Sequence, residues 1–383
     1  MRPAIQGRIM IILGTRPEVI KLAPVIKELT GKAENLRTEV VFTGQHQQMA
    51  RQAMDAFRLK PDVELSAMIP GASLGRMMAR MVSELIPVME TQQTDWVLVQ
   101  GDTTSAMVGA LCAFYSSVKI GHVEAGLRSY NRYSPYPEEA NRAIIGQIAD
   151  LHFAPTPRAV HNLRQAGVRD EAIKLTGNTI VDAVRWISDE LGDEHPDGIS
   201  DELKDKIANK RIILVTSHRR ESFGEKLENI CNALARAVSA LPSAAVVFPV
   251  HLNPRVQSTV QRILGGTMRV NLIAPLEYRA FIWLMKHSHL IVTDSGGIQE
   301  EAATLGIPVL VARNITERPE VVEAGGGLLV GTGANRIEEE ICRLFADESA
   351  WSAMARADNP FGDGQAARRI VEYLYQEVTL ECN

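Results

Sequence analysis

Cysteine and long apolar segments are both scarce in this chain. Its four cysteines lie far apart and lack the spacing of a metal site, a usage typical of a reduced cytosolic protein. The first apolar run, residues 9–13, is too short for a secretory signal or a membrane span, and no other run is long enough. We therefore expect a cytoplasmic protein with no membrane partner.

The chain also lacks the common short motifs of cofactor and catalytic sites. It contains no G-x-x-x-x-G-K-[ST], H-E-x-x-H or G-x-S-x-G segment, which argues against the common kinase, zinc-protease and hydrolase classes. Arg16 and Val19 stand where a dinucleotide fingerprint needs glycines, so we expect neither a nicotinamide cofactor nor a metal. The net charge of −5 argues against non-specific binding to nucleic acid.

The length and the pattern of apolar runs indicate two α/β domains. A chain of 383 residues exceeds most single cores, and short apolar runs alternate with helical segments in both halves. Such alternation predicts doubly wound parallel sheets, here two Rossmann-like domains that face each other across a cleft. We place the first domain at residues 1–178 and the second at 179–364, and expect a final helix at about 365–383 to pack back onto the first.

The predicted elements follow from these runs. Residues 189–210 are polar and charged with helical patches, and are expected to form a surface connection. The predicted strands are 8–13, 38–43, 96–100, 118–123, 151–154, 172–176, 211–216, 244–250, 270–273, 290–293 and 308–312. The predicted helices are about 16–29, 46–57, 73–91, 137–149, 157–166, 225–240, 254–264, 278–286 and 297–305.

Acidic residues gather at the ends of predicted strands in the first half. Asp102 and Glu124 each lie where a predicted strand ends, and the acidic pair Glu138 and Glu139 follows Pro137 at the start of the next predicted helix. Because ligands of open α/β sheets bind beyond the carboxyl ends of the strands, these acids should face one crevice. Together with Arg128 they predict proton-transfer machinery rather than a solvated surface.

Basic residues near the start of the first predicted helix allow two interpretations. Arg16 and Lys21 are placed to meet an anion at the helix start. A solvated helix surface explains them equally well, and both alternatives stay open.

The segment 293–301 predicts an anion site in the second half. A buried strand runs into Ser295, Gly296 and Gly297, where a helix begins with N–H groups and a dipole that favour negative charge. Glycine lets a phosphate approach the backbone closely. Glu301 lies one turn from Gly297 on the same helix face, within reach of a ribose diol. An ordinary serine helix cap is the alternative.

Two histidines follow other predicted strands of the second half. His218 is followed by Arg219 and Arg220, and His251 comes after the next strand. A single histidine is more often structural, but two of them with an arginine pair at neighbouring strand ends indicate contact with a diphosphate.

Segments spread along nearly the whole chain resemble those of the non-hydrolysing UDP-N-acetylglucosamine 2-epimerases. Because they occur in order, the resemblance is far more specific than any single motif. The segments are GTRPEVIKLAP (14–24), TGQH (43–46), GDTT (101–104), HVEAGLR (122–128), YSPYPEEANR (133–142), TGNT (176–179), SHRRESFG (217–224), PVHLNP (249–254), DSGGIQEEA (294–302) and TERPE (316–320).

The resemblance implies the GT-B fold, a homodimer, and interconversion of UDP-GlcNAc and UDP-ManNAc without metal or nicotinamide. It assigns catalysis to Asp102, Glu124, Glu138 and His218. It implies a regulatory UDP-GlcNAc site, present in some members, at Gln45, His46 and Gln48. It assigns substrate binding to Arg16, Lys21, Arg142, His251, Phe281, Ser295, Gly296, Gly297, Glu301 and Arg313, with Phe281 against the uracil and Glu301 on the ribose.

The chemistry narrows the expected mechanism. The C2–H of a nucleotide sugar is not acidic, because no carbonyl adjoins C2, and a redox route needs a nicotinamide. The remaining route is anti elimination of UDP to 2-acetamidoglucal, protonation on the opposite face and re-addition of UDP, which requires more than one carboxylate. We expect the product to supply a surface polysaccharide. The alternatives are a hydrolysing 2-epimerase, an epimerase of a modified UDP-sugar such as a 2,3-diacetamido uronate, a GT-B glycosyltransferase and a non-catalytic nucleotide-sugar binding protein.

Overall fold

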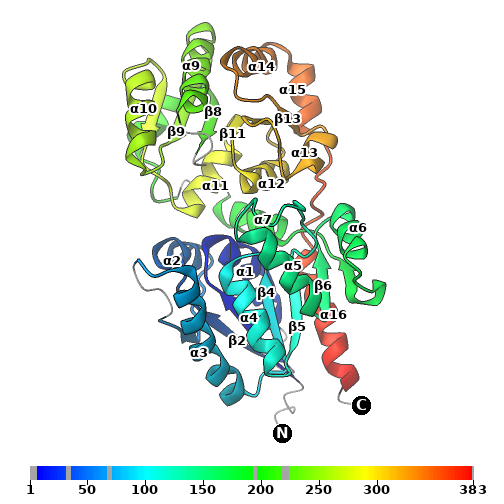
Figure 1. The fold of residues 1–383 in the computed structure, drawn as a ribbon. Coiled ribbons are helices and arrows are strands. Elements are labelled where there is room, and N and C mark those ends of the chain that lie inside the picture. The colour runs from blue at the N-terminus through cyan, green and yellow to red at the C-terminus, as the bar shows by residue number, and fades with distance from the viewer. Residues whose placement is uncertain (1–6, 32–35, 67–70, 193–195, 218–223, 382–383) are drawn as a thin grey trace. The chain divides into compact units, whose positions relative to one another are not determined.

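The chain divides into two compact units. The computed structural model describes residues 7–31, 36–66, 71–192, 196–217 and 224–381 (Figure 1). Unit 1 comprises residues 1–183 and 361–383, and unit 2 comprises residues 184–360. The domain boundaries expected from the sequence, at residues 178 and 364, stay a prediction. Among the helices described, none is long and apolar enough to cross a bilayer.

Unit 1 is built on a parallel sheet. In its described part seven strands run in the order β3-β2-β1-β4-β5-β6-β7. Strands rich in Val, Ile and Leu suit this place because both faces of a parallel sheet are covered, and β1 is buried from Ile9 to Leu13. The strands are β1 (Gly7–Leu13), β2 (Leu36–Phe42), β3 (Val63–Glu64), β4 (Trp96–Gln100), β5 (Lys119–Val123), β6 (Leu151–Ala154) and β7 (Ile173–Leu175).

Helices cover both faces of this sheet. Met10 shares a core with Met77 and Met81 on the side where α3, α4 and α5 pack together. Gly121 lies against Leu98 and faces Leu374 of α16 on the other side, where α16 packs against α1. The helices are α1 (Arg16–Gly31), α2 (Gln47–Ala56), α3 (Leu74–Gln92), α4 (Thr104–Tyr115), α5 (Glu138–Ile148), α6 (Pro157–Gln165), the 3₁₀ turn Asp170–Ala172, the start of α7 (Thr179–Leu191), and α16 (Ala366–Glu381).

Unit 2 repeats this architecture. Six described strands run in parallel in the order β10-β9-β8-β11-β12-β13. Leu290 and Val292 share a core with α9, α10 and α14, and the alternating Ile291 points to the opposite face. The strands are β8 (Arg211–Thr216), β9 (Ala244–Pro249), β10 (Val270–Ile273), β11 (Ser288–Thr293), β12 (Val309–Val311) and β13 (Gly327–Leu329). The helices are α8 (Asp201–Ile207), α9 (Glu225–Ala240), α10 (Pro254–Leu264), α11 (Tyr278–Lys286), α12 (Gly296–Leu305), α13 (Pro319–Glu323), α14 (Ala334–Ala346) and α15 (Glu348–Ala355).

Two Rossmann-like parallel sheets confirm the predicted α/β fold class of the GT-B type. The segment 189–210, expected to be a surface connection with helical patches, contains the end of α7 and the short helix α8. Helix α8 buries Leu203 and Ile207. Those apolar residues are spaced by four, so they form one face of a helix that packs on the unit.

Candidate active site

Asp102 lies in the turn after β4, residues 101–103, which we name the Asp102 turn. Arg142 holds its Oδ2 through Nε at 2.8 Å and Nη2 at 2.5 Å. The Asn141 amide donates to the Asp102 carbonyl, and the His122 Nε2 donates to the Gly101 carbonyl, both at 2.8 Å. Because a carbonyl only accepts, the proton of neutral His122 must be on Nε2. The side chain of Asp102 is 25% exposed and remains accessible to a ligand.

Glu124 follows β5 and has a left-handed backbone with φ of 63°. That conformation is strained for a non-glycine residue and is typical of functional positions. Its buried carboxylate accepts hydrogen bonds from Lys21 Nζ, Gln100 Nε2 and, at 3.4 Å, Asn178 Nδ2. Lys21 is itself buried, so the alternative of a solvated helix surface does not apply to it, whereas Arg16 at the first position of α1 is half-buried.

Glu138 and Glu139 open α5 and have different environments. Glu139 is buried and accepts from Arg128 Nε at 2.8 Å, Ser129 N at 2.9 Å and Arg142 Nη1 at 3.0 Å. Burial opposes its ionisation, but the Ser129 and Arg128 hydrogen bonds prevail and lower the pKa of Glu139. Glu138 Oε2 is buried and has no hydrogen-bond partner among the described residues. Glu139 therefore cross-links two arginines, and Glu138 keeps unused acceptor capacity.

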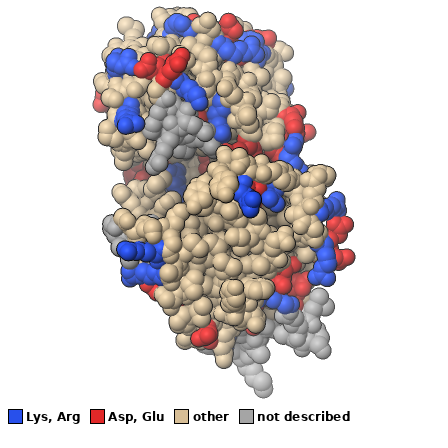
Figure 2. All heavy atoms as spheres, in the orientation of Figure 1, with Lys and Arg blue, Asp and Glu red and all other residues tan. Residues whose placement is uncertain are grey.

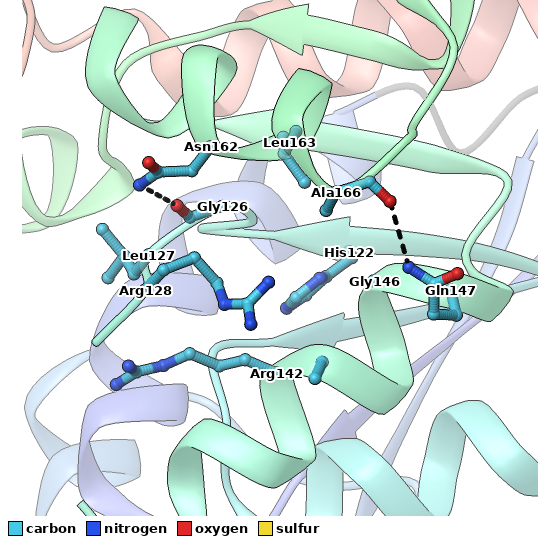
Figure 3. Close-up of a pocket in the computed structure, with 11 residues that line it drawn as sticks. His122, Gly126, Leu127, Arg128, Arg142, Gly146, Gln147, Asn162, Leu163 and Ala166 are labelled. Atoms are coloured by element: carbon cyan, nitrogen blue, oxygen red, sulfur yellow. Dashed lines mark hydrogen bonds between the residues drawn. The ribbon is translucent and has the colours of Figure 1, made fainter. Parts of the chain in front are cut away.

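A small pocket lies between α5, α6 and the loop after β5 (Figure 3). Figure 3 shows the side chain of Arg128 pointing toward His122, with Arg142 below them, and all three line the pocket. Burial lowers the pKa of His122 to about 4, so its ring is neutral near pH 7. Its Nδ1 then carries a lone pair, for which the described part of the chain offers no hydrogen-bond donor.

In unit 2, Ser295, Gly296 and Gly297 join β11 to α12 as the sequence predicts. The side chain of Ser295 does not cap the helix, so the alternative of an ordinary serine cap is wrong. A Cβ added at Gly297 would meet no atom within 4 Å, which leaves space over the first turn of the helix. Glu301 lies one turn further along α12 and is buried.

The remaining predicted residues of unit 2 are distributed around this helix start. His251, Ser295 and Arg313 follow β9, β11 and β12, whose carboxyl ends meet at one edge of the parallel sheet. His251 is exposed and its Nδ1 accepts from a backbone N–H of its own loop at 3.1 Å, while Arg313 pairs with Glu317 at 3.7 Å. Phe281 is buried on α11. His218 lies outside the described residues.

The three residues of the expected regulatory site lie at the start of α2. Gln45 Oε1 accepts from Ser105 N at 3.0 Å and Ser105 Oγ at 2.7 Å, so Gln45 ties this loop to α4. His46 and Gln48 are exposed. A regulatory role for these residues stays a prediction.

Sequence reasoning named Glu139 only as the neighbour of Glu138, and it did not single out Gln100, His122, Asn141 or Asn178. The spacing of three between Glu139 and Arg142 on a predicted helix is a local signal for their ion pair. The other contacts join residues far apart in sequence and have no local signal. Within the residues that the structure describes, no group of three or more His, Cys, Asp or Glu side chains is arranged to hold a metal ion.

The chain is similar to known proteins over nearly its full length. A family model described as UDP-N-acetylglucosamine 2-epimerase matches residues 27–375. The UDP-N-acetylglucosamine 2-epimerase of Escherichia coli strain K12 is 47% identical over 375 residues, which cover 96% of this chain and 98% of that protein. A crystal structure of UDP-GlcNAc 2-epimerase from Neisseria meningitidis bound to UDP-GlcNAc is 41% identical with a TM-score of 0.86, covering 96% of this chain and 100% of that one.

A second solved structure, a co-structure of Staphylococcus aureus MnaA with UDP, is 41% identical with a TM-score of 0.88, covering 98% of this chain and 97% of that one. The similarity therefore extends over nearly the full length of the sequence and of the fold, and it confirms the resemblance seen in the sequence motifs. The chain is an enzyme of the non-hydrolysing UDP-N-acetylglucosamine 2-epimerase family.

Proposed function

We propose that this enzyme interconverts UDP-GlcNAc and UDP-ManNAc by eliminating and re-adding UDP. The observation that carries the proposal is the set of carboxylates at the strand ends of unit 1. Glu124 is buried against Lys21, Asp102 is held by Arg142, and Glu138 keeps an unsatisfied buried oxygen. Three acids in different electrostatic settings at one sheet edge suit proton removal from one face of a sugar ring and proton delivery to the other.

The proposed reaction has two halves. A carboxylate removes the C2 proton, the C1–O bond breaks, and its electron pair leaves with UDP, which gives 2-acetamidoglucal. A protonated acid then delivers a proton to C2 from the opposite face, and a UDP oxygen attacks C1. Atoms and electrons balance without a metal or a nicotinamide. We assign the proton transfers to Asp102, Glu124 and Glu138, with His218 as a further catalytic residue.

We assign binding of the nucleotide to unit 2. Ser295, Gly296 and Gly297 at the start of α12 suit a diphosphate, because the helix dipole and N–H groups there favour an anion. Glu301 is one turn away, where it suits the ribose. His251, Phe281 and Arg313 are assigned to the same nucleotide, and Arg16 and Lys21 to the substrate in unit 1. Retention of UDP between the two halves of the reaction is what makes it reversible.

NMR of UDP-GlcNAc with the purified enzyme in D₂O tests the proposal. Appearance of UDP-ManNAc with deuterium at C2 is the expected result. Release of free ManNAc and UDP would select a hydrolysing enzyme instead. A UDP-GlcNAc spectrum without any change would refute the activity and leave a glycosyltransferase, a binding protein or an epimerase of a modified UDP-sugar.

We also propose that the enzyme is a cytoplasmic homodimer whose product supplies a surface polysaccharide. The visible face of unit 1, where α4 lies in front, carries few charged side chains (Figure 2). Phe114, Tyr115 and Ile144 on α4 and α5 are 53%, 78% and 40% exposed, an apolar content that supports a protein interface. Light scattering should give twice the mass of one chain, and Tyr115→Glu should shift it towards the monomer. A monomeric wild type would refute the dimer.

A further inference from the structure

Glu18 is a buried carboxylic acid that the proposed chemistry does not use. It is the third residue of α1 and is 0% exposed. Burying an ionisable group destabilises the folded state unless hydrogen bonds satisfy it, so the hydrogen-bond partners of Glu18 indicate why it is buried there.

Hydrogen bonds from two separate segments reach the carboxylate of Glu18. The backbone N–H of Gly14, just after β1, donates to Oε2 at 2.9 Å, and the hydroxyl of Thr103 donates to Oε1 at 2.5 Å. Gly14 packs closely against Ser105 and Thr43, because a Cβ there would lie 2.0 Å from Ser105 Oγ and 2.4 Å from Thr43 Oγ1. Glu18 therefore ties the end of β1 to the Asp102 turn.

Thr103 follows Asp102 directly and is also the N-cap of α4. Its Oγ1 accepts a hydrogen bond from Ala106 N at 3.0 Å while its hydroxyl hydrogen goes to Glu18. A hydroxyl has one hydrogen and two lone pairs, so both bonds form together and fix the side-chain rotamer of Thr103. A displacement of Thr103 passes to Asp102 through one planar peptide unit.

The opposite side of the Asp102 turn is held by His122, Asn141 and Arg142. These three residues belong to β5 and α5. From α1, the Glu18 side chain contacts the turn through its hydrogen bond with Thr103. Hydrogen bonds from three elements, α1, β5 and α5, therefore hold the turn.

We propose that Glu18, acting through Thr103, is a positioning residue that fixes the Asp102 carboxylate for proton transfer at C2. The inference rests on the proposed function, in which Asp102 takes part in that transfer. Loss of the link lets the carboxylate shift, and a displacement of about 1 Å at a reacting group costs on the order of a hundredfold in rate. Binding of UDP, assigned to unit 2, does not depend on the turn.

The test compares variants that remove or keep the link. Thr103→Val removes the hydroxyl at nearly constant volume, and Thr103→Ser restores it. We expect Thr103→Val to lower kcat at least about tenfold while UDP affinity by calorimetry changes less than about twofold. Thr103→Ser should recover kcat to within about threefold, because its hydroxyl can make both bonds.

Changes at Glu18 itself provide a second test. Glu18→Gln can accept from Gly14 and donate to Thr103, so it should retain most of kcat. Glu18→Met cannot do either, and its loss of kcat should match that of Thr103→Val. The double variant Glu18→Met with Thr103→Val should be no slower than the worse single variant, because both changes break one path.

Thr156 provides the matched control. It is a buried N-cap whose Oγ1 accepts from Ala159 N at 3.2 Å, at the start of α6, and it follows β6, two strands along the sheet from β4. Thr156→Val should leave kcat unchanged. An equal loss of kcat in Thr156→Val would mean that cap removal, not positioning, slows the enzyme.

The outcomes separate this inference from the proposed function. An active wild type with an equally active Thr103→Val overturns the positioning role and leaves the epimerase proposal standing. A lowered UDP affinity with unchanged kcat also overturns the positioning role. A wild type that does not convert UDP-GlcNAc overturns the proposed function and, with it, this inference.

Discussion

Glu18→Gln should stabilise unit 1 relative to the wild type, and this stability difference should grow as the pH rises from acidic to alkaline values. Burial raises the pKa of Glu18 from its ordinary 4.5 to about 7, although hydrogen bonds from Thr103, Thr15 and Gly14 oppose the change. In the unfolded chain the carboxyl has its ordinary pKa. Between pH 4.5 and about 7 the folded protein therefore holds a proton that the unfolded chain has lost.

The sign and the size of the effect follow from this difference. Because the folded state binds more protons in that window, the Glu18 contribution to the free energy of unfolding is complete below pH 4.5 and is lost as the pH rises through about 7. Each tenfold change in proton affinity is worth about 1.4 kcal/mol, so the loss is about 3 kcal/mol. Glutamine fills the same volume and does not ionise. Relative to wild type, Glu18→Gln should gain about 3 kcal/mol between pH 4.5 and 8.

Urea unfolding of both proteins at several pH values measures this gain. Trp96 is in unit 1, whereas Trp186, Trp283 and Trp351 are in unit 2, so the fluorescence change that Trp96→Phe removes identifies the transition of unit 1. Glu28→Gln, at an exposed position of the same helix, is the matched control. A stability difference between wild type and Glu18→Gln that varies by less than about 1 kcal/mol over this range would refute the reasoning.

Three further predictions concern other parts of the molecule. Gly297→Asp should weaken UDP binding at least about tenfold in calorimetry, because a carboxylate would face the diphosphate. The fold should persist in this variant, and the control Gly297→Ala should bind UDP normally. Normal UDP affinity in the aspartate variant would argue against this site. His152 is buried, and burial followed by the neighbouring His122 lowers its pKa to about 4, so the stability that it supports is lost as the pH falls below 6.5. In urea titrations His152→Phe should therefore remove about 2 kcal/mol of the acid destabilisation between pH 7.5 and 5. The same pH dependence of stability in the wild type and the variant would be the contrary result. Lys21→Met leaves Glu124 buried without its cation, which should destabilise unit 1 by about 3 kcal/mol and reduce kcat; full activity in a stable variant would contradict the role given to this pair.

Local patterns fixed most of the elements in advance. Strands β4, β6, β8 and β10 and helices α9, α10 and α11 begin and end at the predicted residues. These segments have a clear apolar period and flanking turn or cap residues, such as Asn253 and Pro254 at the start of α10. Where those signals are weak, prediction failed. Helix α4 is apolar on nearly every side, so it has no amphipathic period to detect, and α13 has only five residues.

The candidate site was also predicted from the sequence only in part. The sequence placed Asp102 and Glu124 at strand ends and Ser295 at a helix start, because parallel strands bring their carboxyl ends to one edge. It left open whether Lys21 is solvated and whether Ser295 caps its helix. Burial of Lys21 and the absence of a Ser295 cap bond answer both questions.

What the sequence by itself determined is the order of strands and helices and the kinds of side chain at their ends, since these depend on neighbours within a turn or two. Tertiary structure alone decided which groups meet: Lys21 with Glu124, Glu18 with Thr103, and Glu139 rather than Glu138 with the arginines. The first two pairs are 103 and 85 residues apart in the chain. Such contacts are set by how whole strands pair and how helices pack on them, and the protonation of a buried carboxyl follows from that packing and not from its place in a motif.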